Sequence, residues 1–570
     1  MLFEWISQPV KDVVLDTSNF DKQPPPVITQ ILCQREIDSE NKFKKFIKPQ
    51  LSDLYDPFLM NGMQRAVDRV VAALESGEKI LIYGDYDVDG VTSVSILYQA
   101  IHSLGGKVDF YIPDRLSEGY GLSIAGIEKA VKKKTSLIIT VDCGITANNE
   151  IAYAQLKGID TIICDHHELV AEKPDAFAIL DPKLKECKYP FKELAGCGVA
   201  FKLLQGLCEV LQIEKDFLYQ FLDLVALGTA ADIVDLRFEN RTMVKYGLEL
   251  INSKPSYGIE ALLKTCGLVK QKITVNLIVF LLAPRLNAVG RISNAKKAVH
   301  LLTSSSPQQA KNIAQILDSE NKRRKDIDEE TLKEAEEQIA RDHNLEKDCV
   351  LVLAKENWHL GVLGIIASRI LEKYNRPAVL ISINDGIGKG SARSKANFSI
   401  FDACNNLSEY LISYGGHECA AGLTIEAGKI DIFRKKINEI ATNTVDVNNS
   451  LPTLNIDSFV SLNEFTGSFL KWLDWLAPFG PKNMRPVFVT KNIDISGNII
   501  IIGGNHLKFK VKQNGVVIDA IAFNMAKYQS VLEQENIKIN CAYVIEESNW
   551  HGQVTIQLRI KDFEVSDGTE

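Results

Sequence analysis

Short apolar runs of β-forming residues alternate with helix-like segments through the first half of the chain. The runs include "KILIY", "VDFYI", "SLIITV" and "DTIIC", and the segments between them include "VSILYQAIHSL", "IAGIEKAVKKK" and "NEIAYAQLKG". Runs this short and this continuously apolar are typical of strands buried on both faces. We therefore predict a parallel sheet of βα units that is covered by helices on both faces.

Acidic and histidine residues stand where these predicted strands end. Three aspartates at every second position follow the first run, one follows the third, and an Asp-His-His triplet follows the fourth: Asp85, Asp87, Asp89, Asp142, Asp165, His166 and His167. A further aspartate, Asp232, lies in "LVALGTAADIVDL" after a predicted helix and a glycine-containing turn. Open α/β sheets bind ligands outside the carboxyl ends of their strands, so we expect these segments to converge on one crevice.

Carboxylates clustered in a partly desolvated crevice would repel one another unless a cation lay between them. Carboxylates joined by an imidazole suit hard or borderline divalent ions, which favours Mn²⁺ or Mg²⁺ over a thiolate-held Zn²⁺. Two such ions about 3.5–4 Å apart would offset the repulsion and activate a water for attack on phosphorus. The alternative is that each aspartate only caps the helix after its strand. A lone aspartate fits that alternative, but the pattern on successive strand ends favours a two-metal phosphoesterase.

Length and composition bound the classes of protein. A chain of 570 residues exceeds what one hydrophobic core usually holds and predicts roughly three or four domains. Hydrophobic residues make up 46% and charged residues 24%, and the absence of a run of about 18 uncharged apolar residues argues against a membrane protein. The first residues lack the pattern of a secretory signal, and the 11 cysteines include no C-x-x-C pair, so we expect a cytoplasmic protein. The net charge of −8 argues against a generally basic surface but leaves local patches open.

The second half of the chain divides into three further parts. Ser306 as N-cap and Pro307 at the first helical position predict a long exposed helix, in which the charged run "NKRRK" is better explained as a solvated face than as a binding site. A smaller α/β pattern begins near residue 350, and alternating strands after about 450 predict a β-barrel, with a hairpin signal at Asn514-Gly515. The predicted boundaries are 1–305 for the first domain with its N-terminal extension, 306–345 for the helix, 346–447 for the second α/β domain and 448–570 for the barrel.

Residues 482–516 carry six basic residues and one acidic residue, Asp494. This segment is therefore positively charged, whereas the whole chain is negatively charged. Lys508, Lys510 and Lys512 lie on one face of a predicted strand, where they could contact a nucleic-acid backbone. Strand alternation places Phe509 on the opposite face, which favours a core role over base stacking. The lysines are therefore the stronger candidates for DNA binding.

These residues resemble a known superfamily. "DYDVDG", "VDCG", "DHH" and "GTAADIV" are similar to the four phosphoesterase motifs of the DHH superfamily, and "GGHECAAG" at 415–422 is similar to the signature of its associated C-terminal domain. Over nearly the whole chain the resemblance is to the RecJ family of single-strand-specific 5′→3′ exonucleases, and it includes "PDRLSEGYGL", "APRLNAVGRI", "WHLGVLGIIASR", "GSARS" and "PFGPKNMRPVF". The chain departs from the family near Lys482, where a second glycine is usual.

The resemblance implies roles for the acidic and histidine residues. It implies that the metals and the catalytic step involve Asp87, Asp89, Asp142, His166 and Asp232. It makes Asp85 a metal ligand or a partner of one, and Asp142 the best candidate for bridging two ions. His167 is expected to contact the scissile phosphate or to orient a ligand. Asp165 is expected to brace an imidazole or the turn from outside the metal shell.

The resemblance also implies how a substrate is held. Arg115, Arg291 and Arg393 each lie among turn-forming residues, where a guanidinium can reach a phosphate bidentately, and Ser391 could complete a cradle for a 5′-phosphate. The alternative for each arginine is a solvated surface charge. His417 lies among glycines that would let the backbone approach a ligand, although a structural role stays open.

The expected fold is therefore α/β, with a parallel-sheet DHH domain joined by a long helix to a smaller DHH-associated domain, and a C-terminal barrel of the oligonucleotide-binding (OB) type. The expected function is Mn²⁺- or Mg²⁺-dependent degradation of single-stranded DNA from its 5′ end to 5′-mononucleotides. The resemblance further implies work in DNA recombination and repair beside a RecQ-type helicase and a single-strand-binding protein. The alternatives are a DHH phosphodiesterase for short oligonucleotides or cyclic dinucleotides, and a non-enzymatic replication scaffold.

Overall fold

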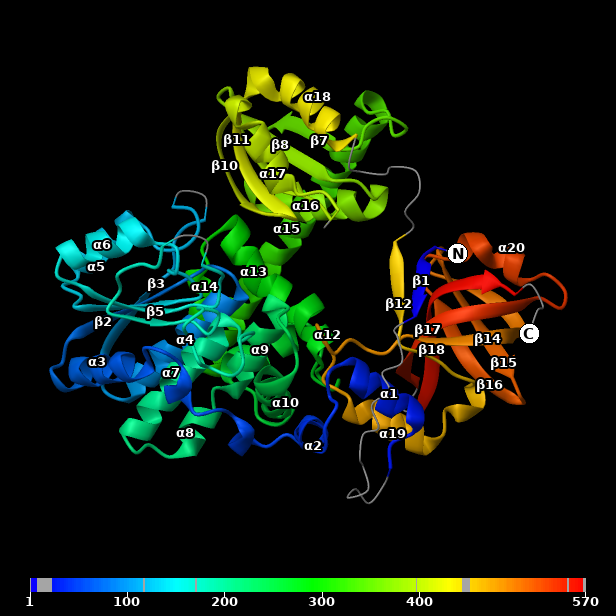
Figure 1. Cartoon of the computed structure of the whole chain (residues 1–570), viewed down its shortest axis with the longest axis horizontal. Coiled ribbons are helices and arrows are strands. Elements are labelled where there is room, and N and C mark those ends of the chain that lie inside the picture. Colours follow the sequence, from blue (N-terminus) through cyan, green and yellow to red (C-terminus); the bar gives the residue numbers. More distant parts are fainter. Residues whose placement is uncertain are drawn as a thin grey trace. The chain divides into compact units, whose positions relative to one another are not determined.

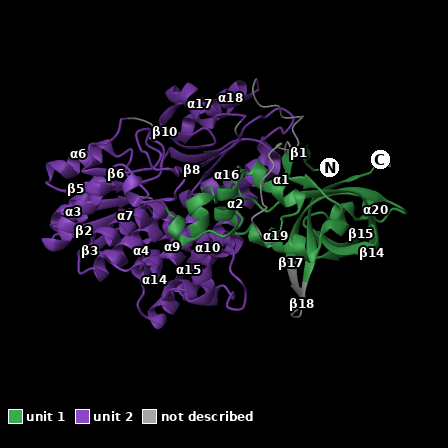
Figure 2. Ribbon diagram, turned by 60° about the horizontal axis from the view of Figure 1, so that its bottom comes forward, with its two compact units in different colours: residues 1–54, 233–242, 451–570 green, residues 55–232, 243–450 purple. Residues whose placement is uncertain are grey.

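The computed structural model describes residues 2–7, 23–115, 118–169, 172–395, 397–442, 452–550 and 553–566 (Figure 1). The chain forms two compact units (Figure 2). Unit 1 contains Met1–Leu54, Ile233–Thr242 and Leu451–Glu570, and unit 2 contains Tyr55–Asp232 and Met243–Ser450. Residues 1–54 and 233–242, which we assigned from sequence to the first domain, therefore group with the C-terminal residues.

The first α/β part of unit 2 is built on a parallel five-stranded sheet, as predicted. Its strand order is β3-β2-β4-β5-β6, with the bounds Lys107–Tyr111, Lys79–Gly84, Leu137–Val141, Asp160–Cys164 and Ala178–Leu180. Every residue of the central β4 is buried, because helices cover both faces of the sheet. The short edge strand β6, "AIL", was not predicted.

Three helices bring the remaining site residues to this sheet. They are α4 (Val88–Ser103), α7 (Gly196–Val210) and α9 (Leu222–Asp232). Gly228 lets α9 pack closely against α4 and α7. A Cβ at this position would lie 2.3 Å from Thr92 Oγ1 and 2.6 Å from Cys197 Sγ. The other helices of this part are α3 (Met63–Glu75), α5 (Ile124–Lys132), α6 (Asn148–Leu156), α8 (Lys215–Tyr219), α11 (Tyr257–Thr265), α12 (Val275–Leu277), α13 (Ala283–Ile292) and α14 (Lys296–Leu302). Helix α10 (Phe238–Ser253) begins in unit 1 and continues into unit 2.

The long helix α15 runs over Pro307–Asp342, with Ser306 at the N-cap and Pro307 at the first helical position. The predicted exposure of this helix is correct for one side only. One face is buried and includes the polar residues Asn321, Asp328 and Thr331 together with Ala310, Ala314 and Leu317. The helix is therefore a packed element of unit 2 with one solvated side.

The second α/β part has a mixed five-stranded sheet in the order β10-β11-β9-β8-β7. The bounds are Leu411–His417, Ala420–Glu426, Ile387–Arg393, Ala378–Asn384 and Leu351–Glu356. Only β7 and β8 pair in parallel, and the other neighbours are antiparallel. Its helices are α16 (Leu360–Tyr374), α17 (Ile400–Asn406) and α18 (Ile430–Ala441).

Unit 1 contains the predicted barrel, in the strand order β13-β14-β15-β16-β18-β17, which closes through pairing of β14 with β17. The bounds are Ser458–Phe459, Phe488–Ile502, His506–Gln513, Val516–Ala522, Gln553–Val565 and Lys538–Trp550. The hairpin at Asn514-Gly515 is confirmed, because both residues have positive φ and Gln513 pairs with Val516. The short helix α20 (Gln529–Leu532) separates β16 from β17.

The core of unit 1 joins segments from both ends of the chain. Helices α1 (Pro26–Gln34), α2 (Glu40–Ile47) and α19 (Gly467–Trp475) share one hydrophobic cluster with the barrel strands. Strand β1 (Glu4–Ser7) pairs in parallel with β12 (Thr453–Ile456). The N-terminal residues thus complete the unit that contains the barrel.

One segment of the described chain, Val275–Ile292, has the length and mean hydropathy of a membrane-spanning helix. It includes Arg285, which pairs with Asp318 at 2.9 Å, and several fully buried residues of the helical core, among them Ile278 and Leu286. The segment packs within unit 2 through these buried residues and the Arg285–Asp318 ion pair.

Candidate active site

The first acidic motif lies in the turn between β2 and α4. Asp87 is the N-cap of α4 and accepts a hydrogen bond from the Gly90 amide at 3.0 Å. Gly90 permits this tight turn, because a Cβ there would lie 2.5 Å from the Asp85 carbonyl oxygen. Asp87 therefore caps a helix and also points into the acidic cluster, so the two interpretations of this aspartate do not exclude each other.

Helix α13 braces the same turn from outside. The Val88 amide donates to Oδ1 of Asn287 at 3.1 Å. A Cβ at Gly290 would lie 2.6 Å from the Tyr86 carbonyl oxygen, so only glycine allows this approach. The segment "RLNAVGRI" thus holds the acidic turn in place, a role that no local pattern in the sequence indicates.

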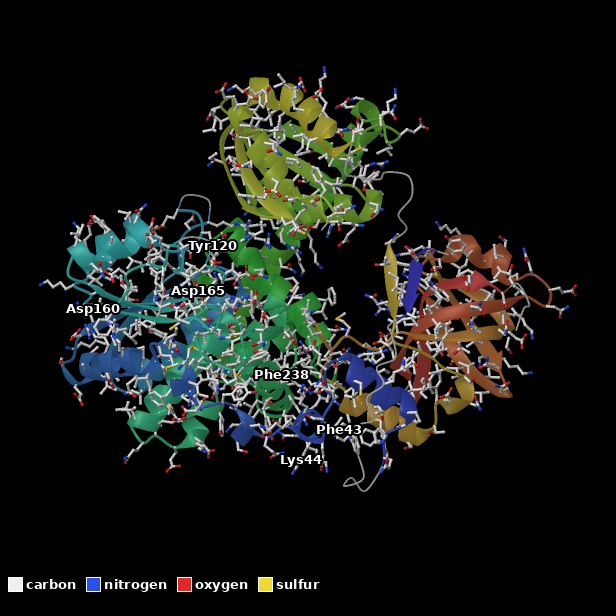
Figure 3. All side chains as sticks on the ribbon, in the orientation of Figure 1. Phe43, Lys44, Tyr120, Asp160, Asp165 and Phe238 are labelled. Carbon is white, nitrogen blue, oxygen red and sulfur yellow. The ribbon has the colours of Figure 1, made fainter. Side chains whose placement is uncertain are left out.

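Asp142 and the histidines follow the next two strands. Asp142 comes directly after β4 in the left-handed region, with φ +58°. Its neighbour Gly196 leaves it space, because a Cβ there would lie 2.8 Å from Oδ1 of Asp142. His166 follows β5, and Figure 3 labels Asp160 and Asp165 at the two ends of that strand, with Tyr120 on the Asp165 side. The expected convergence at the carboxyl ends of the strands is therefore observed.

His166 links the acidic residues. Its Nε2 lies 3.1 Å from Oδ1 of Asp142, 3.7 Å from Oδ2 of Asp232 and 3.8 Å from Oδ2 of Asp89. Three overlapping groups of side chains have ligand atoms within 4.8 Å of one another: Asp85, Asp87 and Asp142; Asp89, His166 and Asp232; and Asp142, His166 and His167. The structure thus brings together all seven residues that the sequence analysis assigned to the metals and the catalytic step.

The position of Asp232 differs from the sequence analysis in one detail. It is the last residue of α9, and Gly228 lies inside that helix rather than in a turn. The residue after it, Ile233, has φ +62°, which is strained for a β-branched side chain. Asp232 therefore reaches the cluster because α9 ends there.

Burial and mutual repulsion disfavour the charged forms of the carboxylates. Burial raises the pKa of Asp85, Asp87 and Asp142, and the negative charges of the neighbouring aspartates raise each further. The same two causes raise the pKa of Asp232 to about 8. Oδ1 of Asp85 and Nδ1 of His166 are buried without a hydrogen-bond partner among the described residues. Bound divalent cations would remove this repulsion, so the residues fit a Mn²⁺ or Mg²⁺ site.

Asp89 is held in a different way. Its two carboxylate oxygens accept hydrogen bonds from the backbone amides of Gly196 at 2.6 Å and Cys197 at 2.8 Å, at the start of α7. Amides at a helix N-terminus favour a negative charge. The carboxylate is thereby oriented before any ion arrives.

Asp165 braces the His-His segment through hydrogen bonds. Its Oδ1 accepts from the His166 amide at 2.8 Å and lies 2.7 Å from Nδ1 of His167, and its Oδ2 accepts from the Ile145 amide at 2.9 Å. Burial opposes the charge on His167, but the bond to Asp165 and the nearby carboxylates outweigh it and raise the pKa of His167 to about 9. The bond to Asp165 therefore favours the protonated form of His167 beside the metal-free cluster.

Two further residues at this edge of the sheet were missed. Asp181 follows β6 and is 1% exposed, and burial raises its pKa to about 7. The only signal for it was its place after a short apolar run. The Tyr120 hydroxyl donates to the Asp142 carbonyl at 3.1 Å and lies 3.4 Å from Nε2 of His167, so its exposed ring forms a wall beside the cluster.

The predicted phosphate-binding residues gather only in part. A hollow of about 460 Å³ is lined by Arg115, Ser391 and residues of α16, β9, β10 and β11. The Arg393 guanidinium donates to Ser391 Oγ at 3.2 Å. Burial lowers the pKa of Arg393, and the charge of Arg115 lowers it further. Their mutual repulsion would be relieved by an anion such as a phosphate group.

Arg393 adjoins the hollow through its bond to Ser391 without lining it, and Arg291 and His417 also lie outside the lining. Arg291 donates to the Gly361 carbonyl at 3.2 Å, and its pKa is lowered by burial and then by the charge of Arg115. His417 is exposed at the end of β10. The structure thus places two of the five predicted substrate residues, Arg115 and Ser391, in the hollow, with Arg393 bonded to Ser391. The charge of Arg115 also acts on Arg291.

The three lysines proposed for DNA binding lie on β15 of unit 1. Lys510 and Lys512 are exposed and Lys508 is half-buried, while Phe509 is 2% exposed and belongs to the barrel core. The preference for a core role of Phe509 is confirmed. The loop residue Lys482 has φ +59°, the backbone region that favours glycine.

Comparisons with known proteins agree with this architecture. The model of the DHH family N-terminal domain matches residues 79–229, that of the DHHA1 domain residues 347–443, and that of the RecJ OB domain residues 456–562. The single-stranded-DNA-specific exonuclease RecJ of Bacillus subtilis is 38% identical over 95% of this chain and 68% of its own length. The Escherichia coli protein of the same name is 32% identical over 96% of this chain and 97% of its own length.

Solved structures give the same result. The crystal structure of RecJ in complex with Mn²⁺ from Thermus thermophilus matches with a TM-score of 0.80 and 27% identity, over 96% of this chain and 77% of that one. A crystal structure of exonuclease RecJ bound to manganese matches with a TM-score of 0.62 and 32% identity, over 70% of this chain and 99% of that one. Fold and site therefore define a DHH phosphoesterase with an OB domain, whose cofactor is Mn²⁺ or Mg²⁺. The chain belongs to the RecJ family of single-stranded-DNA-specific exonucleases.

Proposed function

We propose that this protein digests single-stranded DNA from its 5′ end and releases 5′-mononucleotides. The observation that carries the proposal is the buried cluster of aspartates around His166, which needs divalent cations and lies in the same unit as the hollow lined by Arg115 and Ser391. Membership of a family of single-stranded-DNA-specific exonucleases supports the substrate. The hollow supports the 5′ polarity, because Arg115 and Ser391 line it, Arg393 adjoins it, and all three offer donors to a terminal phosphate.

The proposed roles of the residues follow from their positions. Asp85, Asp87, Asp89, Asp142, His166 and Asp232 would hold two Mn²⁺ or Mg²⁺ ions, with Asp142 between the two groups of ligands. Bound ions supply an activated water and neutralise the charge of the pentacoordinate phosphorus. His167, oriented by Asp165, would donate a hydrogen bond to the scissile phosphate. Arg115, Arg291, Ser391 and Arg393 would hold the 5′ end, with His417 at the rim.

The remaining parts of the proposal concern DNA binding and cellular context. Lys508, Lys510 and Lys512 would contact the phosphates of the strand beyond the active site. We propose four domains with the bounds 1–305, 306–345, 346–447 and 448–570. The two compact units do not follow these bounds, because unit 1 combines residues 1–54 and 233–242 with residues 451–570. We further propose a cytoplasmic protein of DNA recombination and repair that works beside a RecQ-type helicase and a single-strand-binding protein.

Digestion of end-labelled single strands tests the proposal. A strand labelled on its 5′-terminal nucleotide should release labelled mononucleotide at once in Mn²⁺ or Mg²⁺, and a 3′-labelled strand should release its label only at the end. Chelator should stop both reactions, and a fully paired blunt duplex should resist. Immediate release from the 3′ end, or a product larger than a mononucleotide, would contradict the proposal.

A further inference from the structure

The outer face of the barrel carries an exposed aromatic side chain, Phe523, beside the three lysines of β15. On β15 the odd positions Leu507, Phe509 and Val511 point into the core, so the even positions point outward. The pairing of Leu507 with Ala522 aligns His506 with Phe523, directly after β16. The two rings lie 5.0 Å apart in an edge-to-face arrangement, and Phe523 is 43% exposed. Strands β15 and β16 lie side by side in the barrel (Figure 1).

Several contacts support this aromatic pair. The backbone amide of Asn524 donates to Nδ1 of His506 at 3.0 Å. The side-chain amide of Asn505 donates to the side-chain oxygen of Asn524 at 2.9 Å. Arg559 on β18 lies with its guanidinium 5.7 Å from the centroid of the Phe523 ring. Arg559 is itself paired with Glu546 at 3.1 Å. Arg559 therefore lies over one face of the Phe523 ring, and the exposed remainder of the ring is open to a stacked base.

Neighbouring residues on the same face fit a polyanion with planar groups. Lys508 pairs across the sheet with Ile521, which in turn aligns with Arg559. Two residues farther along β15 lies Lys510, about 6.8 Å away along the strand, with its Nζ 3.8 Å from Oδ1 of Asp519. Lys508, Lys510 and Arg559 outnumber the acidic partners Asp519 and Glu546. A positively charged track beside an exposed aromatic face is what single-stranded nucleic acid requires, because every base has a π-face and every linkage a charge.

We propose that Phe523, His506 and Arg559 form a base-stacking subsite for single-stranded DNA, with Lys508 and Lys510 contacting the adjacent phosphates. The subsite rests on the proposed function and adds to it the part of unit 1 that recognises bases rather than charge. It replaces Phe509, which the fold buries, with an aromatic residue that is exposed on the lysine face.

Binding to strands with and without bases tests the subsite. The full-length protein in chelator, which prevents cleavage, is titrated by fluorescence anisotropy with a labelled oligothymidylate and with a strand of equal length made of abasic residues. Stacking on an aromatic side chain is worth about 1–3 kcal/mol per base. Phe523→Leu, which keeps an apolar side chain but removes the π-face, should therefore reduce the preference for the base-bearing strand at least fivefold. Phe459→Leu, at another exposed phenylalanine of unit 1, should leave that preference unchanged.

Other outcomes of the same titration overturn the proposal. An unchanged preference in Phe523→Leu would show that bases do not stack there. Equal losses on both strands would identify Phe523 as a structural residue or as part of a protein-docking surface with the exposed Ile500 and Ile502. Failure of the proposed function is recognised separately, because it would appear as wrong polarity or no cleavage by the wild-type protein on end-labelled strands.

Discussion

The imidazole Nε2 of His166 lies 3.1 Å from Oδ1 of Asp142, although 24 positions separate the two residues in the chain. Each residue follows one of two neighbouring parallel strands, β4 and β5, so the parallel pairing itself brings them together. Around this pair the aspartates raise one another's pKa, which means that repulsion between carboxylates destabilises the metal-free site. That repulsion makes the effects of single substitutions predictable.

Asp142→Asn should separate stability from activity. We expect the metal-free variant to unfold at a higher temperature than the wild type, because one buried like charge is removed and asparagine tolerates the positive φ at this position. Cleavage should fall by about 10² or more, since several kcal/mol of transition-state stabilisation depend on the bound ions. Thermal unfolding in chelator and in Mn²⁺, together with turnover, checks both parts. Near-normal turnover would refute the bridging role of Asp142.

Arg393→Ala should discriminate between two kinds of 5′ end. Loss of a charge-assisted contact of about 1.5–3 kcal/mol should lower kcat/KM about 10- to 100-fold on a 5′-phosphorylated strand and much less on a 5′-hydroxyl strand. Lys429→Ala, which removes an exposed cation from the same α/β part, serves as the matched control. Equal losses on both strands would place Arg393 away from the terminal phosphate.

The three lysines of β15 should account for part of the salt dependence of DNA binding. Replacing all three by alanine should make the slope of log affinity against log salt shallower by about 2, at roughly 0.7 per lost phosphate contact. The measurement is binding to a long single strand across a salt series in chelator. The control variant carries alanine at three lysines of α2 in the same unit, and an unchanged slope in the β15 variant would exclude these lysines from the DNA path: Lys508, Lys510 and Lys512 against Lys42, Lys44 and Lys45.

Asp181→Asn should stabilise the metal-free protein in a pH-dependent way. Burial raises the pKa of Asp181 to about 7, against about 3.9 in the unfolded chain. The folded state therefore binds more protons between these values, and its stability falls as pH rises from about 4 to 7. Asparagine removes this loss, so the variant should gain up to a few kcal/mol above pH 7 and nothing below pH 4. Urea unfolding at pH 4 and pH 8 checks the difference, and an equal effect at both pH values would contradict it.

Lys482→Gly should stabilise unit 1. Lys482 has φ +59°, which costs an L-residue about 1–2 kcal/mol, and glycine removes that cost while losing about 0.5–1 kcal/mol through unfolded-state entropy. A net gain of about 0.5–1 kcal/mol is expected in chemical unfolding. The same substitution at Lys471, which is exposed within α19, should instead destabilise by about 1 kcal/mol. A loss at both positions would show that the Lys482 side chain contributes a stabilising contact.

Much of the architecture follows from local features of the sequence. The continuous apolar runs predicted the buried parallel strands, and the aspartates after them predicted an acidic cluster at one edge of the sheet, because side chains at the carboxyl ends of parallel strands must lie together. The start of α15 at Pro307 and the turn at Asn514-Gly515 follow from backbone preferences of single residues. The two-residue period of a strand assigned Phe509 to the core and its neighbouring lysines to the surface.

Only the tertiary structure decided which distant segments complete each unit. Arg241 shows why: it is 1% exposed, lies 3.8 Å from the ring centroid of Phe46, and donates to the carbonyls of Trp475, Leu476 and Ala477. No local pattern predicts that an arginine is buried among partners more than 190 positions away. The same holds for Asn287 beside the acidic turn, for the burial of Asp181 and for the exposure of Phe523. Local sequence determines the period and the ends of an element, whereas burial and hydrogen-bond partners depend on which other elements pack against it.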